Sequence, residues 1–317
     1  MSKAFENSLD TQNFTIVDGY AKAVSVLSRS YTPLCSISGG SDSDIVLDII
    51  HNVDEKKNVR YFWIDTGLEY QATKEHLDYL ENKYGIEIER VKACKPIPTC
   101  CKEYGQPFLS KYVSEQIMRL QLHGFQWEDK PLPELLEKYP NCKIALQWWC
   151  NAYYSPESGV VQMSQFSIGR NKWLKEFMVA NPPDFKISNK CCEYAKKKPA
   201  KLLIKQLDAD LEIIGVRKAE GGIRSASYKT CFSESKTKGC NSYRPVFWYT
   251  DSDKKSYEEF YNIQHSRCYT EYGLKRTGCV GCPYNPKVTE ELEIIKKFEP
   301  NLYTAAVNIF GDSYEYT

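Results

Sequence analysis

The stretch Ser38-Gly39-Gly40-Ser41-Asp42-Ser43 has the residue types of a loop that binds phosphate. Its two glycines allow a sharp turn and a close approach of the backbone to an anion, and its serines supply hydroxyl groups. A stretch typical of a buried strand precedes it and a helix-forming stretch follows it, so the positive end of that helix would face the anion. The spacing is neither that of a Walker loop nor that of the dinucleotide fingerprint. The alternative is a plain strand-to-helix turn that Asp42 or Ser43 caps.

A second polar turn, Asp65-Thr66-Gly67, ends the next predicted strand. In a parallel sheet, the turns that follow neighbouring strands meet at one edge and form a single crevice. The two turns together therefore predict a phosphate-binding site at that edge.

The hydrophobic pattern predicts the elements that position these turns. Strands are expected at 33–38, 59–64, 86–91, 211–216 and 244–249, and helices at 17–27, 45–50, 70–84, 189–207, 258–263 and 289–310, the last broken at Pro300, with helices and loops over 107–181. Strands that alternate with helices indicate parallel βαβ units, and so an α/β fold with a doubly wound, mostly parallel sheet. We expect residues 1–225 to form the nucleotide-binding domain, and residues 226–317 to form a Cys-rich C-terminal extension packed on the same core.

The motifs in chain order resemble a known family. The pairing of SGGSDS with WIDTGLEY resembles the PP-loop nucleotide α-hydrolase (adenine nucleotide α-hydrolase-like) superfamily, and within it the phosphoadenosine phosphosulfate (PAPS) reductase branch of phage and bacterial type. Four further segments match: Tyr104-Gly105-Gln106-Pro107-Phe108 with Ser110-Lys111; Cys191-Cys192 with Lys196 and Pro199; Gly215-Val216-Arg217 with Glu220 and Arg224; and Thr277-Gly278-Cys279-Val280-Gly281-Cys282-Pro283. The resemblance covers residues 35 to 285.

The resemblance implies a role for each matching residue. The loop from Ser38 to Ser43 would hold a phosphate or sulfate of the nucleotide, and Asp65, Thr66 and Gly67 would lie near the adenosine. Lys196, Arg217 and Arg224 would neutralise the anionic end and take part in catalysis. For each lone basic residue the alternative is a solvated surface charge. This alternative is least expected for Arg217, because that residue ends an apolar strand.

Several of the 13 cysteines have the spacing of metal ligands. Cys279-x-x-Cys282 is such a pair, and the adjacent Cys191 and Cys192 form another. The resembling adenylylsulfate reductases hold a [4Fe–4S] cluster with this arrangement, which implies Cys191, Cys192, Cys279 and Cys282 as ligands here and Cys268 as a reserve. A zinc site and no metal at all are the alternatives. We expect Cys100 and Cys101 to be structural, together with Cys35, Cys94, Cys142 and Cys150. The four histidines fall in no ligand-like pattern.

Two enzymatic reactions fit the resemblance. In one, adenylylsulfate or PAPS is reduced to sulfite. In the other, ATP, with Mg²⁺, is cleaved at the α-phosphate to activate a nucleic acid or a small molecule for sulfur insertion, as in DNA phosphorothioation. No cysteine follows Cys282, where the reductases carry a nucleophilic cysteine on their tail, so we expect no efficient thioredoxin-dependent reduction unless Cys231, Cys240 or Cys268 takes that role. A non-catalytic nucleotide sensor is the third alternative.

Composition sets the broad class. The net charge of +1 gives no indication of a nucleic-acid surface, and the apolar share of 42% is typical of globular proteins. The sequence has no transmembrane stretch and its first residues lack a signal-peptide core, so we expect a cytoplasmic protein without a membrane partner. The expected partners are an adenine nucleotide and a redox or sulfur-donor protein.

Overall fold

The computed structural model describes residues 3–152, 168–221, 227–235 and 239–316. The chain divides into two compact units, and each is built from two separate segments. Unit 1 comprises Met1–Cys94 and Ala195–Cys279, and unit 2 comprises Lys95–Tyr194 and Val280–Thr317. The domain boundary expected after residue 225 thus falls inside unit 1.

Unit 1 contains the six-stranded sheet, in the order β3-β2-β1-β4-β6-β5. The strands are β1 (Pro33–Ser36), β2 (Arg60–Asp65), β3 (Ile88–Lys92), β4 (Leu211–Ile213), β5 (Phe232–Ser233) and β6 (Asn241–Tyr243). All neighbouring pairs are parallel except the β5–β6 pair at the edge. The predicted α/β fold with a mostly parallel sheet is therefore confirmed, and the strand order reverses between β1 and β4.

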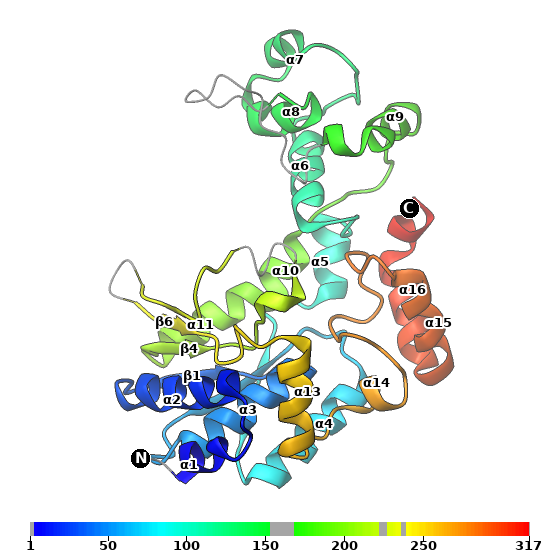
Figure 1. Cartoon of the computed structure of the whole chain (residues 1–317). Helices are drawn as coiled ribbons and strands as arrows, with labels where there is room; N and C mark the ends of the chain where they lie inside the picture. Colours follow the sequence, from blue (N-terminus) through cyan, green and yellow to red (C-terminus); the bar gives the residue numbers. More distant parts are fainter. Residues whose placement is uncertain (1–2, 153–167, 222–226, 236–238, 317) are drawn as a thin grey trace. The chain divides into compact units, whose positions relative to one another are not determined.

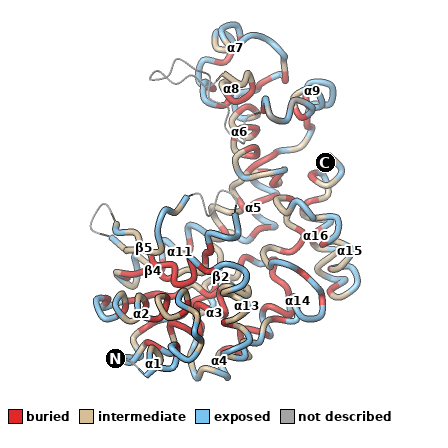
Figure 2. Tube along the Cα trace, in the orientation of Figure 1, coloured by how far each residue is buried: buried red, intermediate tan, exposed pale blue. Residues whose placement is uncertain are grey.

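Helices lie on both faces of this sheet (Figure 1). Unit 1 contains α1 (Lys3–Leu9), α2 (Phe14–Ser28), α3 (Ser41–Val53), α4 (Gln71–Tyr84), α11 (Lys198–Gln206), α13 (Asp251–Phe260) and α14 (Arg267–Thr270). Side chains alternate between the faces: Cys35, Tyr61 and Trp63 pack into the core formed with α2, α3 and α4, whereas Leu34 and Phe62 pack with Leu203 of α11. Because both faces are covered, consecutive residues of β1 and β2 are buried, as is typical of strands in a parallel sheet. Figure 2 colours the chain by this burial.

The prediction of a strand at 244–249 is wrong. The strand that pairs with β4 is β6, which ends at Tyr243, and the residues after it form turns whose amides bond three residues back, from Phe247 to Arg244 and from Tyr249 to Val246. A short buried apolar run has the same pattern in a strand and in a compact turn, so periodicity alone does not separate them.

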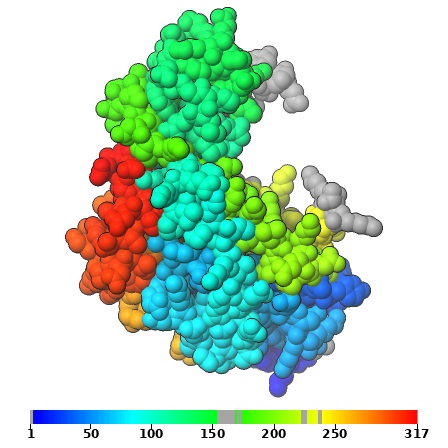
Figure 3. All heavy atoms as spheres, turned by 180° about the vertical axis from the view of Figure 1, so that it is seen from behind, coloured from blue at the N-terminus to red at the C-terminus, as the bar shows by residue number. Residues whose placement is uncertain are grey.

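The helix predicted at 189–207 is present but interrupted. It consists of α10 (Lys190–Cys192), a π-helical stretch (Glu193–Lys197) and α11. Its exposed lysines are Lys197, Lys198, Lys201 and Lys205. This part of the chain lies at the surface in the view from behind, where it is yellow-green (Figure 3). The helices expected around 17–27, 45–50, 70–84 and 289–310 are confirmed, with the break at Pro300.

Unit 2 is helical in its described part. Its helices are α5 (Ile97–Tyr104), α6 (Lys111–Leu122), α7 (Leu132–Lys138), α8 (Lys143–Trp149), α9 (Lys172–Ala180), α10, α15 (Val288–Phe298) and α16 (Pro300–Glu315). A second hydrophobic core lies here, built around Phe125, Trp127, Trp148 and Trp149. Within the described ranges, no helix has the length and apolar character needed to cross a membrane.

Candidate functional site

The SGGSDS loop joins β1 to α3 at the carboxyl end of the strand. Gly39 has a φ of 67° and a Cβ there would lie 2.6 Å from Thr73 Cγ2, so both the backbone conformation and the packing require glycine. The buried hydroxyl of Ser43 accepts a hydrogen bond from the Ser38 amide at 2.9 Å and closes the turn. No side chain caps the N-terminus of α3. The helix thus presents its first amide groups at the loop, as anion-binding helices do.

The turn after β4 lies against this loop. A Cβ added to Gly215 would lie only 3.2 Å from Ser43 N, so the two backbones are in close contact. On the other side, Tyr269 Oη and Thr277 Oγ1 lie 3.3 and 3.4 Å from the position of a Cβ on Gly40. The surroundings of the loop are therefore polar and come from three separate parts of unit 1. This convergence is the one expected at the switch point of a doubly wound sheet.

Arg217 follows the β4 turn and binds the loop through a carboxylate. Its Nε donates to Asp42 Oδ1 at 2.9 Å, and its Nη1 donates to Asp251 Oδ1 at 2.8 Å. Burial acts to raise the pKa of Asp42, but its hydrogen bond with Glu220 and the charges of Lys254 and Arg217 outweigh burial, so the pKa is lowered. Arg217 thus lies beside the loop, and its side chain also donates to the Tyr249 carbonyl oxygen at 3.5 Å. Its predicted role toward the nucleotide stays a prediction.

The second predicted turn follows β2. Asp65 Oδ1 accepts from the Gly67 amide at 2.9 Å, and the buried Thr66 hydroxyl donates to Glu69 Oε1 at 2.5 Å. Burial raises the pKa of Glu69, and the charge of Lys196 partly offsets this effect. The structure therefore places Lys196 beside Glu69 at the end of β2. Arg224 lies outside the described residues.

A chain of charged residues next to the loop was missed by the sequence analysis. His265 Nδ1 lies 2.8 Å from Asp44 Oδ2, and His265 Nε2 lies 2.8 Å from Glu258 Oε1. His76 Nε2 is 3.0 Å from the same Asp44 oxygen, although no hydrogen bond joins them. Lys254 Nζ, from α13, donates to Ser41 Oγ and Asp42 Oδ1. No sequence signal pointed to these residues because the partners are far apart along the chain.

Several thiols share one neighbourhood in unit 2, where the charge of Cys192 also acts on Cys100. Cys191 has side-chain hydrogen bonds with Cys101 and Cys192, and its pKa is raised, first by the bond with Cys101. The charge of Cys282 acts on Cys191 in the same direction. The structure thus brings together Cys191, Cys192 and Cys282 of the predicted ligand set, and it adds Cys101, which the sequence analysis took as structural.

The other two predicted ligands lie in unit 1. Cys279 Sγ is 3.9 Å from Thr66 Oγ1, and the fully buried Cys268 has its Sγ 3.7 Å from Thr73 Oγ1. Over the residues that the structure describes, no group of three or more His, Cys, Asp or Glu side chains is arranged to hold a metal ion. A tetrahedral zinc ion needs four thiolates about 2.3 Å from one point. An iron–sulfur cube binds each thiolate to a different iron and so accepts wider spacing.

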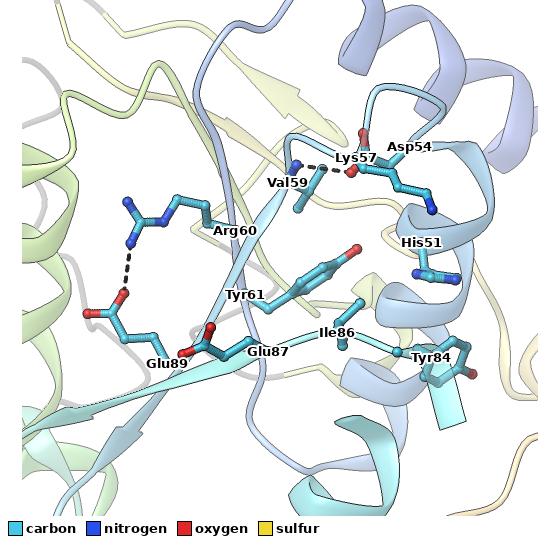
Figure 4. Close-up of a pocket in the computed structure, with 11 residues that line it drawn as sticks. His51, Asp54, Lys57, Val59, Arg60, Tyr61, Tyr84, Ile86, Glu87 and Glu89 are labelled. Atoms are coloured by element: carbon cyan, nitrogen blue, oxygen red, sulfur yellow. Dashed lines mark hydrogen bonds and ion pairs between the residues drawn. The ribbon is translucent and has the colours of Figure 1, made fainter. Parts of the chain in front are cut away.

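A cavity of about 620 Å³ lies elsewhere on unit 1 (Figure 4). Its lining comes from the beginnings of β2 and β3 and from the end of α3, and it includes His51, Lys57, Arg60 and Tyr61. These are the amino ends of the strands, opposite to the edge that carries the loop. The cavity is therefore separate from the candidate nucleotide site.

Comparison with known protein families matches part of the chain. The phosphoadenosine phosphosulfate reductase domain model matches residues 32–120, which include β1, the SGGSDS loop and the turn after β2. Residues 32–120 form a PAPS reductase family domain. No curated protein matches the chain in sequence.

Solved structures show only distant likeness. A PAPS reductase from Candida auris in a phosphate complex is 13% identical, covering 82% of this chain and 87% of its own, with a TM-score of 0.42. The U34-tRNA thiolase NcsA from Methanococcus maripaludis, with its [4Fe-4S] cluster, is also 13% identical, with coverages of 95% and 78% and a TM-score of 0.40. An NH3-dependent NAD synthetase from Campylobacter jejuni is 12% identical, with coverages of 94% and 93% and a TM-score of 0.34. Likeness of this degree says nothing about reaction or ligand.

Proposed function

We propose that this chain is an enzyme of sulfur chemistry that binds an adenine nucleotide at Ser38–Ser43 and acts on its phosphate or phosphosulfate group. The observation that carries the proposal is the uncapped N-terminus of α3 behind a loop that Gly39 and Ser43 shape, within the segment that the PAPS reductase domain model matches. The turn after β4 lies against that loop, and the turn after the neighbouring parallel strand β2 ends at the same edge of the sheet, as expected of a nucleotide site. ATP, adenylylsulfate and PAPS are the candidate substrates, and ATP would bring Mg²⁺.

Reduction of PAPS or adenylylsulfate requires a reactive thiolate. Of the three thiols considered as substitutes for a tail cysteine, Cys268 is fully buried, and burial raises the pKa of Cys240 to about 12. Both are poor nucleophiles, because the thiolate is the reactive form. Cys231 is partly exposed and is the remaining candidate of the three.

Cleavage of ATP at the α-phosphate is the second candidate reaction. It needs no thiolate for the cleavage itself, and so it is favoured by the burial of Cys268 and the raised pKa of Cys240. The activated acceptor would then be a nucleic acid or a small molecule. The exposed lysines of the 197–205 stretch offer positive charge for a phosphate backbone.

We also propose an iron–sulfur cluster held by Cys191, Cys192 and Cys282, with Cys279 as the fourth ligand. The thiol donors suit iron, and three of these four share one neighbourhood in unit 2. Cys101 is the alternative fourth ligand because it contacts Cys191. When bound, such a cluster supplies electron transfer or a site for a sulfur atom.

One experiment separates these functions. Anaerobically prepared protein is titrated with ATP, adenylylsulfate and PAPS by calorimetry, and the products of separate incubations that contain a dithiol as electron donor are identified. Sulfite indicates reduction, and AMP with pyrophosphate indicates ATP cleavage. Binding without turnover would indicate a sensor, and absence of binding by all three nucleotides would overturn the proposal. If sulfite appears, Cys231→Ser tests which thiol is the nucleophile.

A further inference from the structure

The SGGSDS loop contains one carboxylate, Asp42, and no basic residue, and a second carboxylate, Asp44, follows it directly. The positive end of α3 amounts to only about half a charge. An anionic phosphate group at this loop would therefore meet an acidic sequence with little to balance it. A loop of this composition needs a cation from another part of the chain.

We propose that Lys254 supplies this cation and binds the phosphate group of the nucleotide that lies at the N-terminus of α3; the inference rests on the proposed nucleotide-binding function. Lys254 Nζ lies 2.5 Å from Ser41 Oγ and 2.8 Å from Asp42 Oδ1, although the residues are more than 200 positions apart. The ammonium group thus lies beside the first turn of α3, where the anion would bind. Its side chain is 17% exposed.

The chemistry of the ammonium group leaves room for a ligand. A lysine has three N–H donors and no acceptor. Ser41 and Asp42 take two of them, and the nearest Glu258 oxygen is 3.8 Å away, beyond hydrogen-bond distance. Among the residues that the structure describes, no further acceptor of a Lys254 hydrogen bond is found. A phosphate oxygen can therefore be added without breaking either contact.

The position of Lys254 is fixed by a whole face of α13. Lys254, Tyr257 and Glu258 follow the spacing of one helix face. Tyr257 Oη donates to Asp48 Oδ2 at 2.6 Å, and Glu258 reaches Asp44 through His265. The face therefore meets α3 at three successive places. This arrangement orients the lysine before ligand arrives, which lowers the entropy cost of binding.

The neighbouring Lys255 offers a matched control. It forms the same kind of ion pair one position along, with Glu259 at 3.7 Å, but its side chain is 75% exposed. Neither lysine is in the family motifs quoted for the loop. Only Lys254 reaches α3, so only its charge is expected to influence the nucleotide.

The test measures the affinity of wild-type protein, Lys254→Gln, Lys254→Arg and Lys255→Gln for ATP, adenylylsulfate, PAPS and adenosine by calorimetry. Lys254→Gln is expected to weaken binding of the best nucleotide by about ten- to hundredfold, the range for losing a hydrogen bond to a charged group. Lys254→Arg is expected to recover part of this loss, and Lys255→Gln to change nothing. Adenosine, which carries no phosphate, is expected to bind all variants alike.

Three outcomes would contradict the inference, and they differ in whether they also contradict the proposed nucleotide-binding function. Nucleotide binding that is unchanged in Lys254→Gln overturns the role of Lys254 and leaves the proposed function intact. Equal losses for adenosine and the nucleotides show that Lys254 only maintains the fold, and a melting curve of each variant checks this. If the wild-type protein binds none of the nucleotides, the proposed function and the inference fail together.

Discussion

His265 Nδ1 and Asp44 Oδ2 lie 2.8 Å apart, although 221 positions separate the two residues in the sequence. Burial opposes a charge on His265, but its hydrogen bonds to Asp44 and Glu258 outweigh burial and raise its pKa to about 9 from 6.5. The imidazolium therefore ties α3 to α13 at neutral pH. His76, Lys254 and Tyr269 are further titratable groups beside this cluster.

This tie predicts a pH dependence of stability. Because the folded pKa is the higher one, the stabilisation is fully present below about pH 6.5 and is lost as the pH rises through about 9. It amounts to about 3 kcal/mol at most. Urea unfolding at a series of pH values is expected to show this loss in the wild-type protein and a flatter profile in His265→Gln. His123→Gln, at an exposed position, is the control and is expected to keep the wild-type profile. Equal profiles for wild type and His265→Gln would contradict the prediction.

The two loop glycines are expected to respond differently to alanine. Gly39→Ala places a side chain at positive φ and against Thr73, so we expect a loss of about 1–3 kcal/mol of stability. Gly40 has a φ of −95°, which alanine adopts freely. Gly40→Ala is therefore expected to keep its stability and to lose nucleotide affinity, because the methyl group enters the polar surroundings of the loop. Urea unfolding and calorimetry measure the two effects, and equal stability losses in both variants would refute this difference.

Removal of Arg217 is expected to destabilise unit 1. The arginine and Asp42 have side chains only 9% and 15% exposed, so Arg217→Ala leaves a largely buried carboxylate with one cation fewer. We expect a loss of about 3 kcal/mol in urea unfolding, near the lower end for broken buried pairs. Arg267→Ala is the control, since its carboxylate partners are about half exposed and such pairs contribute little. Similar losses in the two variants would contradict the prediction.

Local pattern was enough to predict β1 to β4 and the turn between β1 and α3, but not β5 and β6. The strands around Leu34 and Phe62 are buried apolar runs next to glycine-containing turns, and this combination has few other structures available to it. The run from Val246 to Trp248 is equally apolar but folds as a turn, so the same pattern predicted a strand there wrongly. What distinguished the two was the pairing of β6 with β4, a contact between distant segments.

The residues around the loop were harder to predict for a related reason. Arg217 was found because it ends an apolar strand, so its position in the crevice follows from the topology. Lys254 and His265 lie on or after a polar helix, where a lysine or histidine is ordinarily a solvated surface residue. Their role depends on which face of α13 packs against α3. Cys101 was missed likewise, because its contact with Cys191 depends on the packing of α5 against α10.

The proposed iron–sulfur cluster gives the last prediction. Protein reconstituted anaerobically with ferrous iron and sulfide is expected to be brown, with a broad absorbance near roughly 400 nm from thiolate-to-iron charge transfer. Cys191→Ala, Cys192→Ala and Cys282→Ala are each expected to lose the iron and the absorbance. They are also expected to lose stability, since metal binding is coupled to folding. Iron content, the absorbance spectrum and a melting curve measure these effects without any assay of activity.

The fourth ligand is decided by two further variants and a control. We expect Cys279→Ala to lose the iron, because the C-x-x-C pair has the spacing of cluster ligands. Cys101→Ala is then expected to keep it, as is Cys100→Ala, which removes the neighbouring buried thiol. The reverse result, with iron lost in Cys101→Ala and kept in Cys279→Ala, would assign the cluster to Cys101, Cys191, Cys192 and Cys282, all of unit 2. A colourless preparation, or one that binds a single zinc ion, would exclude the cluster, since thiolates that hold iron in a cube give both the colour and several irons per chain.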